Sequence, residues 1–285
     1  MLFRSMLIPP SIALILYGII ADVSIGDLLI GGVIPGILVT IAIILTVAFL
    51  VWQDPGRAPA GRSYTMMEKI RALKVVGPLL VLFAAVTGSI YLGVATPTEA
   101  SGIGAFGAML LALWERKLTL STLRTALIDA TRTSCMIVMI ILGAHIFGYF
   151  FTLTQTTQDL VRIVGDLNVS RWMIIALILF GYIVLGFFMD QIAILILTVP
   201  VVLPVVIALG FDPIWFGVIV IVTAEVGMVT PPMGLNVFVV ARYTRRPLGE
   251  IFRGVMPHVI AHVIVIFLLT VFPSIVLWLP STMQR

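Results

Sequence analysis

The sequence predicts an all-α protein that crosses a membrane several times. Its 285 residues are 61% hydrophobic and only 11% charged, and the mean hydropathy is +1.20. A soluble domain carries about 25% charged residues, so this composition excludes a soluble fold. Apolar runs long enough to span a bilayer recur along the chain, for example at 28–52 and 133–151. These observations together predict a polytopic helical membrane protein.

Three basic segments predict how the chain is oriented in the membrane. Residues 52–74, 114–132 and 242–253 contain 13 of the 17 lysines and arginines. Basic loops stay on the cytoplasmic side of a membrane, so we expect these three segments in the cytoplasm. The net charge of +4 is therefore interpreted as a sign of topology rather than of nucleic-acid binding.

This orientation fixes the direction of each expected helix. The first four are 28–51 inward, 75–92 outward, 99–114 inward and 133–151 outward. The next basic segment also lies inside, so the apolar region 172–241 must make a net single crossing. It divides into a re-entrant hairpin over 172–209, with its tip near 186–190, and a discontinuous helix over 213–243, whose halves are 213–226 and 235–243. Two full crossings of 172–209 give the same orientation and remain open as an alternative. The last helix, 254–279, runs outward.

The stretch GMVTPPMGLNVF, residues 227–238, predicts the interruption of that discontinuous helix. Each proline removes a backbone donor and clashes with the preceding turn, so the helix must break there. Lipid cannot satisfy the freed carbonyls and amides, so broken backbone at this depth must line a cavity or face protein. The carbonyls that end the first half carry partial negative charge and suit a small hard cation such as sodium.

A second double proline predicts an internal repeat. Pro9 and Pro10 of the IPPS motif lie 222 positions before Pro231 and Pro232, and Pro35 lies 222 positions before Pro257. By the expected topology the two copies have opposite orientation. Inverted repeats with corresponding broken helices indicate a secondary transporter that binds substrate and ions at the midplane. We therefore expect residues 1–51 to end a first repeat, 52–74 to form a cytoplasmic linker and 75–285 to form the second repeat.

The candidate binding residues lie at the hairpin tip and at the two breaks. Asp190 is an acid inside the membrane, and such acids are functional candidates by default, although a helix-capping role is the alternative. Thr230 offers a hydroxyl and Asn236 an amide as ligand groups. The alternative is that both side chains only satisfy the backbone of the interrupted helix. The full expected set is Gly186, Asp190, Gly227, Thr230, Pro231, Pro232, Met233, Gly234, Asn236, Pro9, Pro10 and Ser11. Sodium is expected at Asp190, Thr230, Gly227 and Met233, partly through backbone carbonyls.

Other polar residues and motifs favour structural roles or stay undecided. Glu225, just before the break, is either an ion ligand or a neutral acid within the bundle. Glu99 follows Pro97 and suits the start of a helix better than substrate contact. The G-x-G-x-x-G pattern at 102–107 lies in a membrane helix, where close packing is the better interpretation. No paired catalytic carboxylates and no phosphate-binding loop are found, so we predict that the chain is not an enzyme and needs no cofactor besides a coupling ion.

At this point the motifs resemble a known family. Residues 186–240, together with the stretches 8–38, 94–105 and LWLP at 277–280, are similar to TRAP transporter large permease subunits, the DctM-like family. The resemblance covers essentially the whole chain. Members carry an earlier half before the IPPS motif, so the resemblance also leads us to expect that this chain lacks the family's N-terminal part.

The resemblance implies a function and partners. It implies an elevator-type secondary transporter of the ion-transporter superfamily kind, located in the bacterial inner membrane. It further implies sodium symport of organic acids such as C4-dicarboxylates or sialic-acid-like carboxylates. Family members work with a small membrane subunit and a periplasmic substrate-binding protein. Two alternatives stay open, an unrelated ion-coupled exchanger and a non-transporting membrane scaffold.

Overall fold

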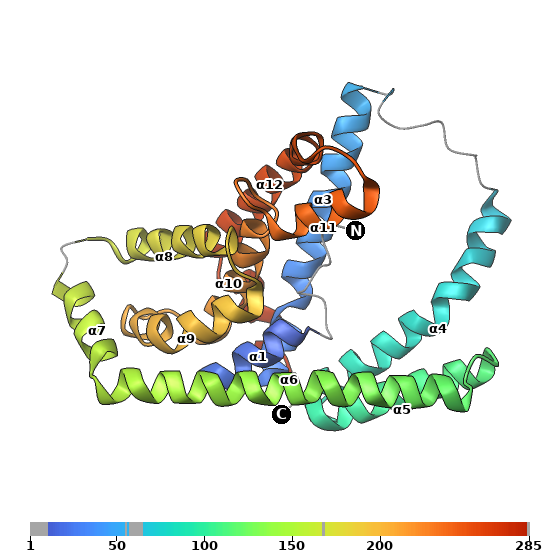
Figure 1. Cartoon of the computed structure of the whole chain (residues 1–285), viewed down its shortest axis with the longest axis horizontal. Helices are drawn as coiled ribbons and strands as arrows, with labels where there is room; N and C mark the ends of the chain where they lie inside the picture. The colour runs from blue at the N-terminus through green and yellow to red at the C-terminus, as the bar shows by residue number, and fades with distance from the viewer. Residues whose placement is uncertain (1–10, 55, 57–64, 167–168, 284–285) are drawn as a thin grey trace. The chain divides into compact units, whose positions relative to one another are not determined.

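The computed structural model is all-helical in the residues that it describes, 11–54, 56, 65–166 and 169–283. The helices are α1 Ile12–Ala21, α2 Ile25–Gly31, α3 Val33–Gln53, α4 Met66–Tyr91, α5 Pro97–Trp114, α6 Leu120–Leu153, α7 Thr156–Asp166, α8 Arg171–Gly186, α9 Gln191–Ala208, α10 Pro213–Gly227, α11 Leu235–Thr244, α12 Leu248–Val271 and α13 Ser274–Ser281. Figure 1 follows them along the chain.

Four stretches within the described residues are long and apolar enough to cross a membrane. They are Ile25–Gln53, Leu120–Leu153, Gln191–Ala208 and Leu248–Val271. Large apolar side chains on these helices are exposed, among them Leu45 at 63%, Met139 at 69% and Ile146 at 73%. Exposed apolar surface of this extent, on helices of membrane-spanning length, is favourable against lipid or a membrane partner. The protein is therefore a multi-pass membrane protein, as the composition predicts.

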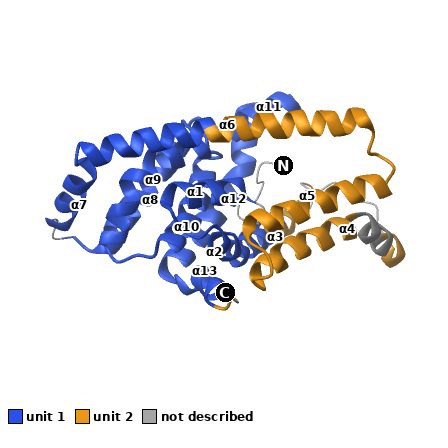
Figure 2. Ribbon diagram, turned by 90° about the horizontal axis from the view of Figure 1, so that it is seen from below, with its two compact units in different colours: residues 1–47, 139–281 blue, residues 48–138, 282–285 orange. Residues whose placement is uncertain are grey.

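The chain divides into two compact units, coloured separately in Figure 2. The first contains residues 1–47 and 139–281, and the second contains residues 48–138 and 282–285. In the second unit α4 packs against α5, where Gly104 lies close to Val86 and Gly107 lies against Leu82. The glycines at 102–107 thus include two that let helices approach closely, in agreement with the packing interpretation of that motif.

Helix α10 forms the core of the first unit, where Figure 2 shows it in the middle of the blue helices. It contacts α1, α2, α8, α9, α12 and α13. Every residue from Trp215 to Gly227 is buried. A helix that is apolar on all sides needs this complete enclosure by protein or lipid. These six helices therefore hold α10, and with it the break that follows Gly227, in a fixed place.

Several helix bounds differ from those expected from hydropathy alone. Helix α6 starts at Leu120 rather than at 133, so much of the basic segment 114–132 is helical. Helix α4 starts at Met66 because Thr65 and Glu68 form a capping box, whereas the expected helix started at 75. Hydropathy finds the apolar centre of a helix, while caps and polar turns outside the lipid set its ends.

The C-terminal segment also differs from the expectation. A single helix over 254–279 is expected, but α12 ends at Val271 and α13 begins at Ser274. Pro273 lies between them and cannot donate a backbone hydrogen bond. The connection 152–171, expected as a loop, contains the short helix α7, which buries none of its residues.

Candidate functional site

Helices α8 and α9 follow each other and pack together, and Asp190 lies in the connection between them, while a re-entrant hairpin stays a prediction. Helix α8 ends at Gly186, and Asp190 is the N-cap residue of α9. Its Oδ2 accepts a hydrogen bond from the backbone N–H of Ile192 at 3.1 Å, and the residue is exposed. The side chain therefore satisfies one of the free amides at the start of α9. It keeps a second carboxylate oxygen for another partner.

The helix break lies between α10 and α11, at residues 228–234. The hydroxyl of Thr230 donates a hydrogen bond to the carbonyl of Val226 at 2.6 Å. The backbone N–H of Thr230 donates to the carbonyl of Gly227 at 3.1 Å. The backbone N–H of Asn236 donates to the carbonyl of Met228 at 3.2 Å. The last turn of α10 is thus closed by the loop itself. The hydroxyl oxygen of Thr230 still has lone pairs to offer a ligand.

Gly234 is the residue that lets the chain restart as α11. Its φ of +51° lies in the left-handed region, and no side chain caps the new helix. An added Cβ would lie 3.0 Å from Cε1 of Phe252 and 3.3 Å from the carbonyl oxygen of Thr230. Glycine suits this position because it has neither the Cβ clash nor the strain of positive φ.

The hairpin tip and the break meet at two glycines. An ideal Cβ on Gly186 would lie 2.7 Å from Cα of Gly227 and 2.9 Å from the carbonyl oxygen of Ala224. Both glycines are buried, and the backbones of α8 and α10 touch there. Two of the expected site residues are therefore in direct backbone contact, although 41 positions separate them in the sequence.

The remaining expected residues are distributed around this contact. Pro231, Pro232 and Met233 are exposed on the loop, and Asn236 is half-buried in the first turn of α11. Ser11 caps α1, where its hydroxyl accepts a hydrogen bond from the backbone N–H of Leu14 at 3.3 Å. Pro9 and Pro10 lie outside the described residues.

The electrostatics of this junction favour a cation. Helices α8 and α10 both end here, and neither has a basic residue in its last turn. Each helix C-terminus carries roughly half a negative charge. Two such ends in contact, next to an interrupted helix, form the kind of environment in which broken membrane helices bind small cations.

Gln191 is a residue of this junction that the sequence reasoning missed. Its carboxamide is buried, at 2% exposure, and Nε2 donates to the carbonyl of Ile221 on α10 at 2.8 Å. It ties the start of α9 to the core helix. The signal in the sequence was a second polar residue directly after Asp190, at the start of a long apolar run.

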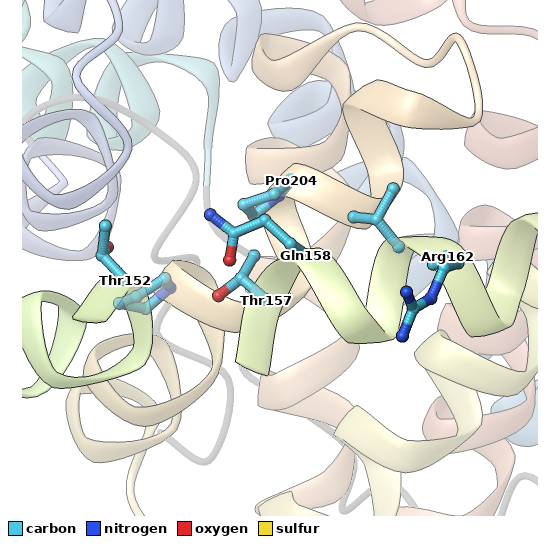
Figure 3. Close-up of a pocket in the computed structure, with 7 residues that line it drawn as sticks. Thr152, Thr157, Gln158, Arg162 and Pro204 are labelled. Atoms are coloured by element: carbon cyan, nitrogen blue, oxygen red, sulfur yellow. The ribbon is translucent and has the colours of Figure 1, made fainter. Parts of the chain in front are cut away.

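A pocket in the first unit lies apart from all these residues. It has a volume of about 440 Å³ and lies between the end of α6, α7 and α9 (Figure 3). Thr152, Thr157, Gln158, Arg162, Pro200 and Pro204 are among the residues that line it. Arg162 is already paired with Asp159 at 2.9 Å. The pocket contains none of the expected binding residues.

A family match and two similar proteins point to the same class of transporter. Residues 4–275 match the family described as "Tripartite ATP-independent periplasmic transporter, DctM component". The chain is 32% identical to a C4-dicarboxylate TRAP transporter large permease protein of Pseudomonas aeruginosa, over 96% of this chain and 64% of the relative. It is equally identical, with the same coverage, to a sialic acid TRAP transporter large permease protein of Vibrio cholerae.

A third relative has a different printed substrate. An isethionate TRAP transporter permease protein of Oleidesulfovibrio alaskensis is 29% identical over 94% of this chain and 42% of the relative. The chain therefore spans less than two thirds of the length of each of these three relatives. Their names share a transporter class and a permease role, and they differ in substrate.

Proposed function

Because this chain belongs to the family of the DctM component of tripartite ATP-independent periplasmic transporters, we propose that it works in the membrane pathway of a sodium-coupled importer of organic acids. As a large permease subunit it is a transporter component and not an enzyme. The proposed substrates are carboxylates of the kinds named for the relatives, C4-dicarboxylates or sialic acids.

The proposal includes partners and a location. "Tripartite" in the family description supports two further components. We take these to be a small membrane subunit and a periplasmic substrate-binding protein that delivers the ligand. The membrane is then the bacterial inner membrane, with the basic segments 52–74, 114–132 and 242–253 on the cytoplasmic side.

One observation carries the proposal most directly, the contact between Gly186 and Gly227. It places the C-termini of α8 and α10 together beside the break at 228–234. The convergence of two negative helix ends supports sodium binding at this junction. Asp190, on the same hairpin tip, supplies a full negative charge.

The helix bounds support the inverted-repeat, elevator-type design. Shifted by 222 positions, α1 covers 234–243, close to α11 at Leu235–Thr244. The same shift carries the stretch Ile25–Gln53 to 247–275, close to α12 at Leu248–Val271. Corresponding elements at one constant offset are the expected trace of two repeats.

Replacement of Asp190 tests the proposed site. In proteoliposomes that contain the chain with its partner subunits, Asp190→Asn should lower sodium-dependent uptake by about tenfold or more, because a charged ligand is lost. Asparagine remains a good N-cap, so the helix start is preserved and the change removes only the charge.

Asp212→Asn is the matched control for that experiment. Asp212 caps α10 through Oδ1, which accepts from Ile214 at 2.7 Å, but it lies at the opposite end of that helix from the break. Uptake by this variant should equal that of the wild type. Equal loss in both variants, or none in Asp190→Asn, contradicts the assignment of Asp190.

A further inference from the structure

The pocket of Figure 3 lies at the end of a membrane-spanning helix. The long apolar run of α6 reaches Phe151, and the polar residues Thr152, Thr154 and Gln155 are found directly after it. Such a change from apolar to polar side chains marks the level at which a helix leaves the hydrocarbon of a bilayer. The pocket, between the end of α6, α7 and α9, is therefore at the level of the lipid headgroups.

Helix α7 has the pattern of a helix that lies at a membrane surface. Leu160, Val161 and Val164 lie on one side of it and are half-buried, while Gln158 and Arg162 lie on another side and are exposed. A short helix with one apolar and one polar side is stable in the plane of the interface. The pocket follows the boundary between these sides, with Val161 from the first and Gln158 and Arg162 from the second.

Arg162 gives one part of the pocket a positive group. Its Nη2 donates to Oδ1 of Asp159 at 2.9 Å, and the side chain is 74% exposed. A guanidinium has several more N–H donors, which are available to an anionic group of a ligand. The pairing with Asp159 offsets the positive charge, so this part of the pocket does not suit a ligand that is only anionic.

Another part of the lining supplies acceptors. The hydroxyl of Thr152 donates to the carbonyl of Gly148 at 3.0 Å, which leaves its oxygen to accept. On α9, Pro200 and Pro204 have no backbone N–H. The carbonyls one turn earlier, those of Ile196 and Pro200, therefore lose their usual helical donor and lie beside the proline rings. Carbonyls freed in this way within a membrane protein need a donor from elsewhere.

These groups together fit a zwitterionic ligand. A phosphate matches the guanidinium of Arg162, and a primary ammonium group, which donates through its N–H groups, matches the hydroxyl and carbonyl oxygens. Figure 3 shows Thr152 and Arg162 on opposite sides of Thr157 and Gln158, so the two kinds of group are separated along the pocket. A quaternary ammonium group has no N–H and leaves the freed carbonyls unsatisfied.

Apolar surface beside the pocket accommodates the rest of a lipid. Near Thr152, α6 exposes Tyr149 at 67%, Phe150 at 58% and Leu153 at 66%. The pocket volume of about 440 Å³ suits a headgroup and is too small for a whole phospholipid with its acyl chains. The chains therefore lie outside the pocket, along these exposed side chains at the end of the membrane span.

We propose that this pocket binds the headgroup of a phospholipid that carries a phosphate and a primary ammonium group, as phosphatidylethanolamine does. The phosphate lies at Arg162 and Gln158. The ammonium group lies at Thr152 and at the carbonyls freed by Pro200 and Pro204. The site goes beyond the proposed function, because its ligand is a component of the membrane and neither the transported acid nor a coupling ion.

The test is native mass spectrometry of the purified full chain in detergent. The chain is titrated with phosphatidylethanolamine, phosphatidylcholine and phosphatidylglycerol that have the same acyl chains, and the affinity of the first bound lipid is compared. Phosphatidylethanolamine should bind about tenfold more tightly than either of the others, since they lack the N–H donors of a primary ammonium group.

Two variants and a control locate the site. Arg162→Gln should weaken the binding of phosphatidylethanolamine about tenfold, because a charge-assisted hydrogen bond is lost. Val161→Trp fills the pocket and should abolish the tight binding. Arg246→Gln is the matched control, because Arg246 is also exposed and paired with an acid on the next turn, Glu250, but does not line the pocket. It should bind the lipid as the wild type does.

Two outcomes would overturn the proposal. One is an affinity for phosphatidylethanolamine that is the same in Arg162→Gln, Val161→Trp and the control. The other is binding of phosphatidylcholine or phosphatidylglycerol that is as tight as that of phosphatidylethanolamine, which would show that the pocket does not recognise the primary ammonium group.

Discussion

At the scale of single residues, the junction depends on glycines, because they have no Cβ atom. Gly186 and Gly227 allow two backbones to touch, and Gly234 allows the chain to turn into α11. The sequence motif pointed to all three positions because glycines flank the double proline and end the first arm of the hairpin. It could not reveal that Gly186 and Gly227 meet, since that contact depends on how α8 packs against α10.

This contact makes a prediction about stability. Gly186→Ala places a Cβ 2.7 Å from Cα of Gly227, and the neighbour is backbone, so the helices must separate. Overpacking of this kind costs about 1–3 kcal/mol. Gly181→Ala on the same helix has no atom within 4 Å and should be neutral or slightly stabilising. Thermal unfolding in detergent compares the two, and equal melting temperatures would show that the close approach does not matter.

At the scale of helices, the boundaries of α10 and α11 were predictable because capping residues and prolines mark them in the sequence. For α10 and α11 the expected bounds, 213–226 and 235–243, differ from the observed ones by a single residue at their C-terminal ends. Asp212, Pro213 and the double proline mark these boundaries directly in the sequence. The start of α6 was missed because hydropathy does not change sharply there, and the division between α12 and α13 was missed although Pro273 marks it.

The attachment of α1 to α10 provides a prediction at this scale. The ring of Tyr17 covers Gly217, and its hydroxyl donates to the carbonyl of Pro213 at 2.7 Å. Tyr17→Phe should lower the free energy of unfolding by about 1 kcal/mol through the lost hydrogen bond. Tyr17→Ala should lower it by about 3–5 kcal/mol through the cavity. Chemical denaturation in mild detergent measures both, and similar small losses would mean that the ring does not anchor α1.

At the scale of the whole molecule, composition and motif were sufficient for the class but not for the substrate. Apolar runs predicted a multi-pass membrane protein, and the double-proline stretches identified the family that the comparison shows. The relatives are named for different substrates, and this chain is about equally identical to each of them, at 29–32%. Overall identity therefore does not assign a substrate, and the side chains that select one leave no periodic or compositional signal in the sequence.

The proposed function requires that sodium drives transport through this protein. The most direct measurement is the uptake of radiolabelled organic acid into proteoliposomes that contain the chain, its membrane partner and the loaded binding protein. An inward sodium gradient is compared with a potassium gradient of the same ionic strength. Sodium-driven transport should give accumulation with sodium and none above background with potassium, whereas equal uptake under both gradients would show that sodium is not the driving ion.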